Sequence, residues 1–99
     1  MLNIDKKADG NDLAVAIGGR LDTNTAPELE EALKDELDGV TSLTIDMAEL
    51  EYISSAGLRV LLSLQKTMNN QGQMKVTNAG PAIMDIFEVT GFSDILTIE

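Results

Sequence analysis

Two residue types with many catalytic uses are missing from this sequence, which has no cysteine and no histidine. The absence of cysteine excludes a disulfide framework, a thiolate metal site and a thiol nucleophile. The absence of histidine removes the commonest general base and metal ligand, so a Ser-His-Asp triad cannot be built. The glycines also lack the spacing of the common nucleotide-phosphate loops. The sequence therefore predicts a protein that is not an enzyme and holds no metal and no cofactor.

Aromatic residues and long hydrophobic runs are scarce as well. Tyr52, Phe87 and Phe92 are the only aromatic residues, so the core of this 99-residue chain must be aliphatic. A chain of this length forms one compact domain, which we expect to span residues 1–99. The longest apolar run lies around Val60–Leu62, far short of a membrane span, and the charged N-terminal residues do not resemble a signal peptide. We therefore expect a soluble, cytoplasmic protein.

Positive charge is in short supply. The chain has 7 lysines and arginines against 17 aspartates and glutamates, which gives a net charge of −10. Such a surface repels phosphate backbones and anionic lipids, so we expect no direct nucleic-acid binding and no membrane binding. The charge favours a protein partner with a basic patch, and the alternative is that it serves only solubility.

What the sequence does contain is an alternation of strand and helix patterns. Strands are expected at residues 2–7, 12–21, 43–47, 74–76 and 95–98. Helices are expected to begin near Thr25, Ser54 and Gly80. Turn residues between the first two strands predict a hairpin, and the later alternation of strands with helices implies right-handed crossovers and parallel pairing. The predicted fold class is α/β, a mixed sheet with an opening antiparallel hairpin, then parallel strands and crossover helices.

The predicted helices have recognisable boundaries and inward faces. Thr25 and Glu28 predict a capping box for the first helix, whose apolar spacing runs to Leu37 and whose end is expected at Asp38-Gly39. The second helix is expected to point Leu58, Leu61, Leu62 and Met68 inward. The third helix is expected to point Ile83, Ile86 and Phe87 inward.

A pair of serines, Ser54 and Ser55, stands where a loop becomes the second helix. Serine is a favoured helix cap, so capping alone is one interpretation of this pair. One serine suffices for a cap, however, and the other would lie in the first helical turn. A dianionic phosphate is well tolerated there, because the free N–H groups and the helix dipole both favour negative charge. The pair is therefore either a cap alone or a cap beside a phosphorylation site.

The sequence around these serines resembles the STAS domain, a family named for sulfate transporters and anti-sigma factor antagonists. The resemblance covers almost the whole chain, although each motif is weak by itself. It is carried by Gly19-Arg20-Leu21-Asp22, the strand at residues 43–47, Ser54-Ser55-Ala56-Gly57-Leu58 and Val89-Thr90-Gly91-Phe92.

This resemblance implies a partner-switching cycle. In that cycle the unphosphorylated antagonist binds an anti-sigma factor that is also a serine kinase, and the sigma factor is freed. The kinase then phosphorylates the antagonist, which dissociates, and a phosphoserine phosphatase removes the phosphate again. Alignment on Gly57-Leu58 puts Ser55 at the acceptor position and Ser54 where the family usually has aspartate. Ser54 is the less favoured acceptor.

The resemblance also implies a partner-binding surface. Its predicted residues are Asp22, Thr23, Asn24, Ser54, Ala56, Gly57, Leu58 and Arg59. For Asp22 the alternative is an ordinary turn residue ahead of a helix. Arg59 lies four residues after Ser55 on the same helix face, so it either pairs with a phosphate there or is a solvated charge.

A second role is open to a chain of this family. It is a non-switching STAS subunit of a transporter or signalling-scaffold complex, in which Ser55 would be only a helix cap. Many family members continue into a further helix after the last strand, and such a helix would cover part of the sheet. A small hydrolytic or nucleotide-binding enzyme is the third and least supported class.

Overall fold

The chain begins with a β-hairpin in the computed structural model, which describes residues 2–99. Strand β1 (Leu2–Asp9) pairs antiparallel with β2 (Asp12–Leu21), with Ile4 opposite Ile17. Gly10 turns the chain with φ of +62°, a conformation that glycine adopts without strain. The predicted hairpin is confirmed.

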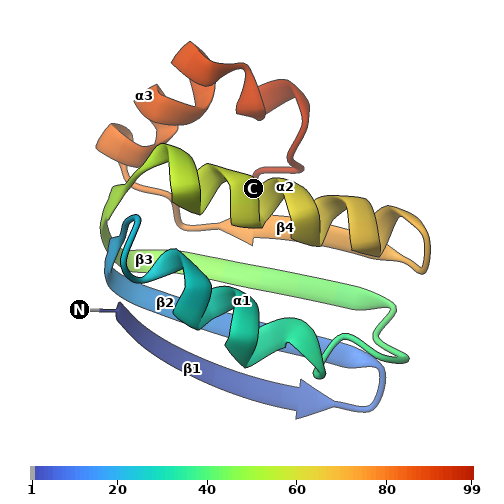
Figure 1. The fold of residues 1–99 in the computed structure, drawn as a ribbon. Coiled ribbons are helices and arrows are strands. Elements are labelled where there is room, and N and C mark those ends of the chain that lie inside the picture. Colours follow the sequence, from blue (N-terminus) through green and yellow to red (C-terminus); the bar gives the residue numbers. More distant parts are fainter. Residues whose placement is uncertain (1) are drawn as a thin grey trace.

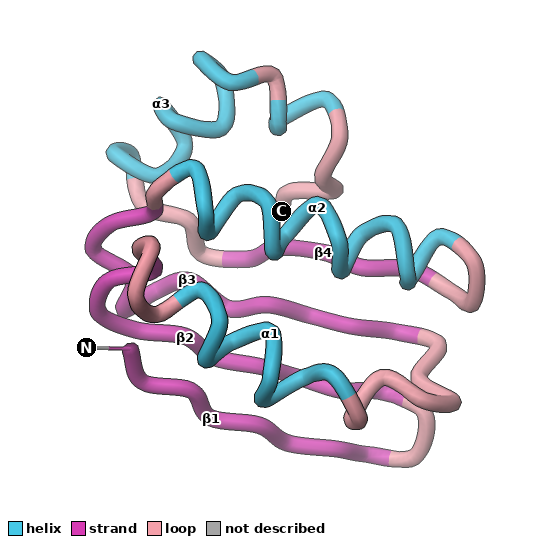
Figure 2. The backbone as a smooth tube through the Cα atoms, in the orientation of Figure 1, coloured by secondary structure: helices cyan, strands magenta, loops and turns pink. Residues whose placement is uncertain are grey.

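Two crossovers then extend the sheet in one direction (Figures 1 and 2). Helix α1 (Ala26–Lys34) leads to β3 (Ser42–Ile53), and α2 (Ser55–Asn69) leads to β4 (Gln73–Thr77). The strand order is β1-β2-β3-β4, and the β2–β3 and β3–β4 pairs are parallel. Right-handed crossovers in a single direction place both helices on one face, where they lie side by side (Figure 1). The α/β fold class with a mixed sheet is confirmed.

The last part of the chain forms a helix but only a trace of the predicted fifth strand. Helix α3 (Pro81–Thr90) ends at Gly91, whose φ of +81° gives it a left-handed cap. A 3-10 turn, η1 (Phe92–Asp94), follows. Ile98 then makes a single parallel bridge to Val76. The prediction of a regular strand over residues 95–98 is wrong, because the N–H groups of Ile95 (3.0 Å) and Leu96 (2.8 Å) donate to the Phe92 carbonyl and so continue the turn of η1.

The core fills the space between the sheet and its helices. In β2, Leu13, Val15 and Ile17 are buried, whereas Ala14 and Ala16 on the other face are exposed. The largest fully buried side chains are Phe87, Ile17, Leu21, Leu29, Leu33, Leu43, Ile45, Met47, Leu61, Met68, Met74 and Ile83. Except for Phe87 they are aliphatic or methionine, as the composition requires. Among residues 2–99, no helix is both long and apolar enough to cross a membrane.

Helix α1 differs from its prediction at both ends. The Thr25 hydroxyl donates a hydrogen bond to the Arg20 carbonyl (2.7 Å) and accepts one from the Asp22 N–H (2.8 Å), so it does not cap the helix. The predicted capping box is therefore wrong. The helix ends at Lys34 rather than at Asp38-Gly39, and Leu37 is buried from the connecting turn.

Strand β3 is much longer than the predicted residues 43–47. Its second half follows β2 through two register shifts, one between Ala16 and Gly18 and one between Gly19 and Arg20. Ala48 and Glu49 are both exposed, which breaks the alternation that marks a strand in the sequence. The extension brings the end of β3 level with the end of β2.

The inward face of α2 also differs in one position. Leu58, Leu61 and Met68 are buried as predicted, but Leu62 is only half-buried. Val60 and Leu64 are buried in its place, because α2 packs against α1 as well as against the sheet. In α3 the predicted Ile83 and Phe87 are buried, and Ile86 is half-buried.

Candidate functional site

The two serines have different positions at the start of α2. Ser54 is the N-cap, with an extended backbone, and its hydroxyl oxygen accepts a hydrogen bond from the Gly57 N–H (3.4 Å). The Ser54 N–H donates to the Leu21 carbonyl (2.9 Å), which ties the cap to the end of β2. Ser55 is the first residue of the helix. Ser54 alone thus caps the helix, and the hydroxyl of Ser55 is not needed for capping.

Ser55 is exposed, and within residues 2–99 its side chain makes no hydrogen bond. It stands among the first N–H groups of α2, which have no partner inside the helix. The first turn of α2 contains no acidic residue that would offset the positive end of the helix dipole. A negative group attached to Ser55 therefore meets a favourable local field.

Gly57 holds this helix start close to the sheet. A Cβ atom added to Gly57 would lie 2.8 Å from Leu21 Cγ and 2.9 Å from Ile53 Cγ1, closer than real contacts allow. Leu58 beside it is buried in the core. These two predicted partner-binding residues are therefore buried in the packing beneath the site.

The loop after β2 lies next to this helix start, because Leu21 and Ile53 are paired at the ends of their strands. In this loop Asp22 Oδ1 accepts hydrogen bonds from the N–H groups of Asn24 (3.0 Å) and Thr25 (3.1 Å) and from the Thr25 hydroxyl (3.2 Å). Asp22 is therefore the turn residue that organises the loop, whatever it contacts outside the chain.

These contacts also set the charge state of Asp22. Partial desolvation raises its pKa, but the hydrogen bonds from Thr25 and Asn24, together with the nearby Arg20, outweigh it and hold the pKa below the ordinary value of 3.8. Asp22 is thus firmly ionised at neutral pH. Thr23 and Asn24 next to it are exposed.

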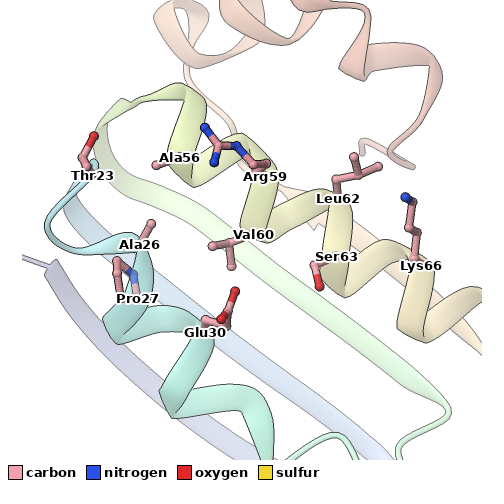
Figure 3. A pocket seen from close by; sticks show the side chains of 10 residues that line it. All are labelled: Thr23, Ala26, Pro27, Glu30, Ala56, Arg59, Val60, Leu62, Ser63 and Lys66. Atoms are coloured by element: carbon pink, nitrogen blue, oxygen red, sulfur yellow. The ribbon is translucent and has the colours of Figure 1, made fainter.

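A groove between α1 and α2 begins at the same edge of the molecule (Figure 3). Its volume is about 500 Å³, and its apolar lining comes from Ala26, Pro27, Ala56, Val60 and Leu62. Its polar lining comes from Thr23, Glu30, Arg59, Ser63 and Lys66. Most of these residues were missed at the level of sequence, because only the packing of α1 against α2 brings them together.

The predicted site residues thus fall into three groups. Ser55, Ala56 and Arg59 are accessible on the first two turns of α2, with half-buried Ser54 as their cap. The loop residues 22–24 lie at the adjoining strand end. The buried Gly57 and Leu58 lie beneath the start of α2 and beside this loop.

Comparison with known proteins identifies a family and relatives that match this chain over nearly its whole length. A model of the STAS domain matches residues 3–99. The anti-sigma-B factor antagonist of Bacillus subtilis (strain 168) is 33% identical over 98 residues, which cover 98% of this chain and 90% of that protein.

Two solved structures share the fold. An anti-sigma factor antagonist from Mycobacterium paratuberculosis superimposes with a TM-score of 0.89 at 24% identity, over 99% of this chain and 85% of that one. The Bacillus cell fate determinant SpoIIAA in its phosphorylated form superimposes with a TM-score of 0.76 at 14% identity, over 98% of this chain and 91% of that one.

Proposed function

We propose, from the premise that this chain belongs to the STAS domain family, that it is an anti-sigma factor antagonist controlled by phosphorylation of Ser55. The unmodified form binds an anti-sigma factor that is also a serine kinase and so frees a sigma factor. Phosphorylation of Ser55 ends this binding, and a phosphoserine phosphatase restores the first state. The chain itself works in the cytoplasm as a binding protein without catalytic activity.

The name of a relative supports the proposal that this chain is an anti-sigma factor antagonist. The relative from Bacillus subtilis is an anti-sigma-B factor antagonist, and the match covers nearly the whole of both chains. A protein of the same fold, SpoIIAA, has been solved in a phosphorylated form. This chain carries a serine at a position suited to the same modification.

The single observation that carries the proposal is the exposed hydroxyl of Ser55 at the first position of α2, beside a serine that already caps the helix. A kinase can reach this hydroxyl without unfolding the helix, since it makes no contact that the fold requires. The added phosphate brings about −1.5 to −2 charges next to the free N–H groups, where the fold accommodates them.

The same phosphate is costly for a bound partner. The surface around it includes Asp22, which is ionised, and the protein already carries a net charge of −10. A partner that packs over Ser55 would have to desolvate the phosphate and accept its charge, which opposes binding. The switch therefore needs no change in the fold of the antagonist.

The test is an in vitro phosphorylation assay. The purified chain is incubated with ATP and each purified anti-sigma kinase encoded by its host, and intact mass is measured. We expect one phosphoryl group per chain, none on Ser55→Ala, and loss of the complex on modification. Absence of phosphorylation by every such kinase, together with stable purification in a transporter or scaffold complex, would instead establish the non-switching subunit.

Ser54→Ala is the matched control in this assay. Loss of the cap should lower the free energy of unfolding by about 1 kcal/mol, whereas Ser55→Ala should leave it nearly unchanged. Both variants should remain folded by circular dichroism. Phosphorylation of Ser54→Ala but not of Ser55→Ala assigns the acceptor, and the reverse pattern would move it to Ser54.

A further inference from the structure

The groove between α1 and α2 differs in charge from the rest of this acidic protein. Arg59 and Lys66 line it from α2, and Glu30 is the one carboxylate among its lining residues (Figure 3). Ion pairs within residues 2–99 join Lys6 to Glu36, Arg20 to Asp22 and Lys75 to Glu99. Arg59 and Lys66 take part in none of these pairs, although acidic residues outnumber basic ones 17 to 7 in the sequence.

The apolar part of the groove adds a second property. Ala56 and Leu62 are half-buried along α2, and Pro27 is exposed on α1. An apolar strip with two unpaired cations beside it is complementary to a segment that carries apolar side chains and carboxylates. It does not match a second copy of this chain, whose net charge of −10 would be brought against its own.

Arg59 is placed to serve both the groove and Ser55. Figure 3 shows its guanidinium extending along α2 toward Ala56, which is the direction of the helix start. Helical side chains lean toward the N-terminus, so a residue at i+4 overlies the residue at i, and an anion at i with a cation at i+4 is the favourable order. A phosphate on Ser55 would thus lie within reach of Arg59, which can bind it through two parallel N–H donors.

We propose that Arg59 couples the two states of the switch by exchanging its anionic partner. With Ser55 unmodified, Arg59 and Lys66 bind carboxylates of an acidic, apolar segment of the anti-sigma factor that docks in the α1–α2 groove. With Ser55 phosphorylated, the phosphate of the same chain binds Arg59, and the segment loses its principal cation. This inference rests on the proposed function and adds the docking surface and the residue that links it to Ser55.

Phosphorus NMR tests the phosphate contact without any partner. Ser55 is phosphorylated by the cognate kinase or installed as phosphoserine during translation, and the phosphate is titrated in the native chain, in Arg59→Gln and in Arg59→Lys. Pairing with Arg59 favours the dianion, so we expect a midpoint in the native chain about 0.3 pH unit below that of Arg59→Gln. Arg59→Lys, which keeps the charge but not the planar fork, should fall between the two.

Lys66→Gln is the matched control, since it removes the same charge from the same groove. Lys66 lies eleven residues after Ser55, or about 16 Å along the helix, so its loss should leave the phosphate midpoint unchanged. A midpoint in Arg59→Gln equal to that of the native chain would overturn the exchange. If Lys66→Gln raised the midpoint of the phosphate titration as much as Arg59→Gln does, the exchange would also be overturned. The midpoint would then reflect the overall positive charge of the groove and not a direct pair between Arg59 and the phosphate.

Binding of the unmodified chain to its anti-sigma factor tests the docking surface. We expect Arg59→Gln to weaken this binding about tenfold, and Lys66→Gln to weaken it severalfold. Lys7→Gln, which removes a charge from the opposite face of the sheet, should have no effect. Phosphorylation should weaken the binding of Arg59→Gln to the anti-sigma factor less than it weakens the binding of the native chain. The variant has no Arg59 that the phosphate could withdraw from the partner's carboxylate.

The two proposals fail in different ways. If an anti-sigma factor binds the native chain but tolerates both groove substitutions, the groove is not its docking surface, while the proposed function stands. If no anti-sigma factor of the host binds the unmodified chain, the proposed function and the docking surface both fall. The phosphate titration gives its result in either case.

Discussion

Asp22 shows how one residue can fix the shape of a functional loop. Its carboxylate accepts hydrogen bonds from Asn24 and Thr25, and its own carbonyl accepts one from the Ala26 N–H (2.8 Å), which starts α1. Thr25 is consequently free to turn its hydroxyl back to the Arg20 carbonyl. The resemblance to the family suggests a partner-facing role for Asp22, and the structure adds a conformational one.

The lowered pKa of Asp22 predicts a specific pH dependence of stability. The folded pKa lies below the ordinary value of 3.8, so the ionised carboxylate stabilises the fold at pH values above that value. This contribution is lost as the pH falls through the folded pKa. Asp22→Asn keeps an acceptor oxygen but removes the charge. We expect the difference in unfolding free energy between the native chain and Asp22→Asn to be full near pH 6 and to shrink below about pH 4.

Urea denaturation of both proteins at several pH values measures this difference. The other carboxylates titrate in both proteins, so their contributions cancel in the comparison. A difference that stays constant down to about pH 2 would show that the charge of Asp22 plays no part in stability.

At the scale of elements, the site depends on how closely α2 starts against the ends of two strands. Glycine in a helix interior usually costs about 1 kcal/mol relative to alanine, so propensity alone favours Gly57→Ala. The buried side chains of Leu21 and Ile53 oppose it, because the new Cβ would lie within 2.9 Å of both. Overpacking of this kind typically costs about 1 to 3 kcal/mol, so the steric effect decides the sign.

We therefore expect Gly57→Ala to lower the free energy of unfolding by about 1 to 2 kcal/mol, measured by urea denaturation. Ser63→Ala is the control, since Ser63 is exposed on the same helix and alanine there should be neutral or slightly stabilising. A stabilised Gly57→Ala would mean that α2 can move away from the sheet at little cost.

The elements that sequence predicted well are those set by local pattern. Strand β2, the hairpin turn at Gly10 and the Gly80 and Gly91 boundaries of α3 follow from spacing and turn chemistry alone. The predictions that failed depended on tertiary contacts. The Thr25 hydroxyl bonds the Arg20 carbonyl of β2 and not the start of the helix. The N–H groups of Ile95 and Leu96 bond the Phe92 carbonyl, which leaves only a single bridge at Ile98 in place of the predicted strand.

At the scale of the whole molecule, the candidate site also has features that the local sequence predicts and features that only the tertiary packing creates. The division between Ser54 as cap and Ser55 as free hydroxyl was predictable, because it depends only on where a helix starts. The groove was not, since Glu30 and Lys66 are brought to one hollow by the packing of two helices. Burial of Gly57 was hidden for the same reason, whereas burial of Leu58 was predicted from the helical spacing. Parallel order then places the loop after β2 and the start of α2 at one edge.

The charge of the whole molecule leads to a last prediction, which concerns salt. Three ion pairs among residues 2–99 favour the fold, but all are surface pairs, each worth about 0 to 1 kcal/mol. Against them stands a net charge of −10 within a radius of gyration of 12.2 Å, close to the screening length of about 10 Å at 0.1 M salt. Repulsion should outweigh the pairs, so we expect the urea midpoint to rise when NaCl is raised to about 0.5 M.

A charge-reduced variant separates this repulsion from general effects of salt on burial. Glu31 and Glu51 are exposed and belong to none of the ion pairs within residues 2–99, so Glu31→Gln with Glu51→Gln changes the net charge from −10 to −10 + 2 = −8. This variant should be more stable than the native chain at low salt and should gain less from added NaCl. A midpoint that falls with salt would instead mean that the attractive pairs dominate, and the acidic surface would then carry no cost to the fold.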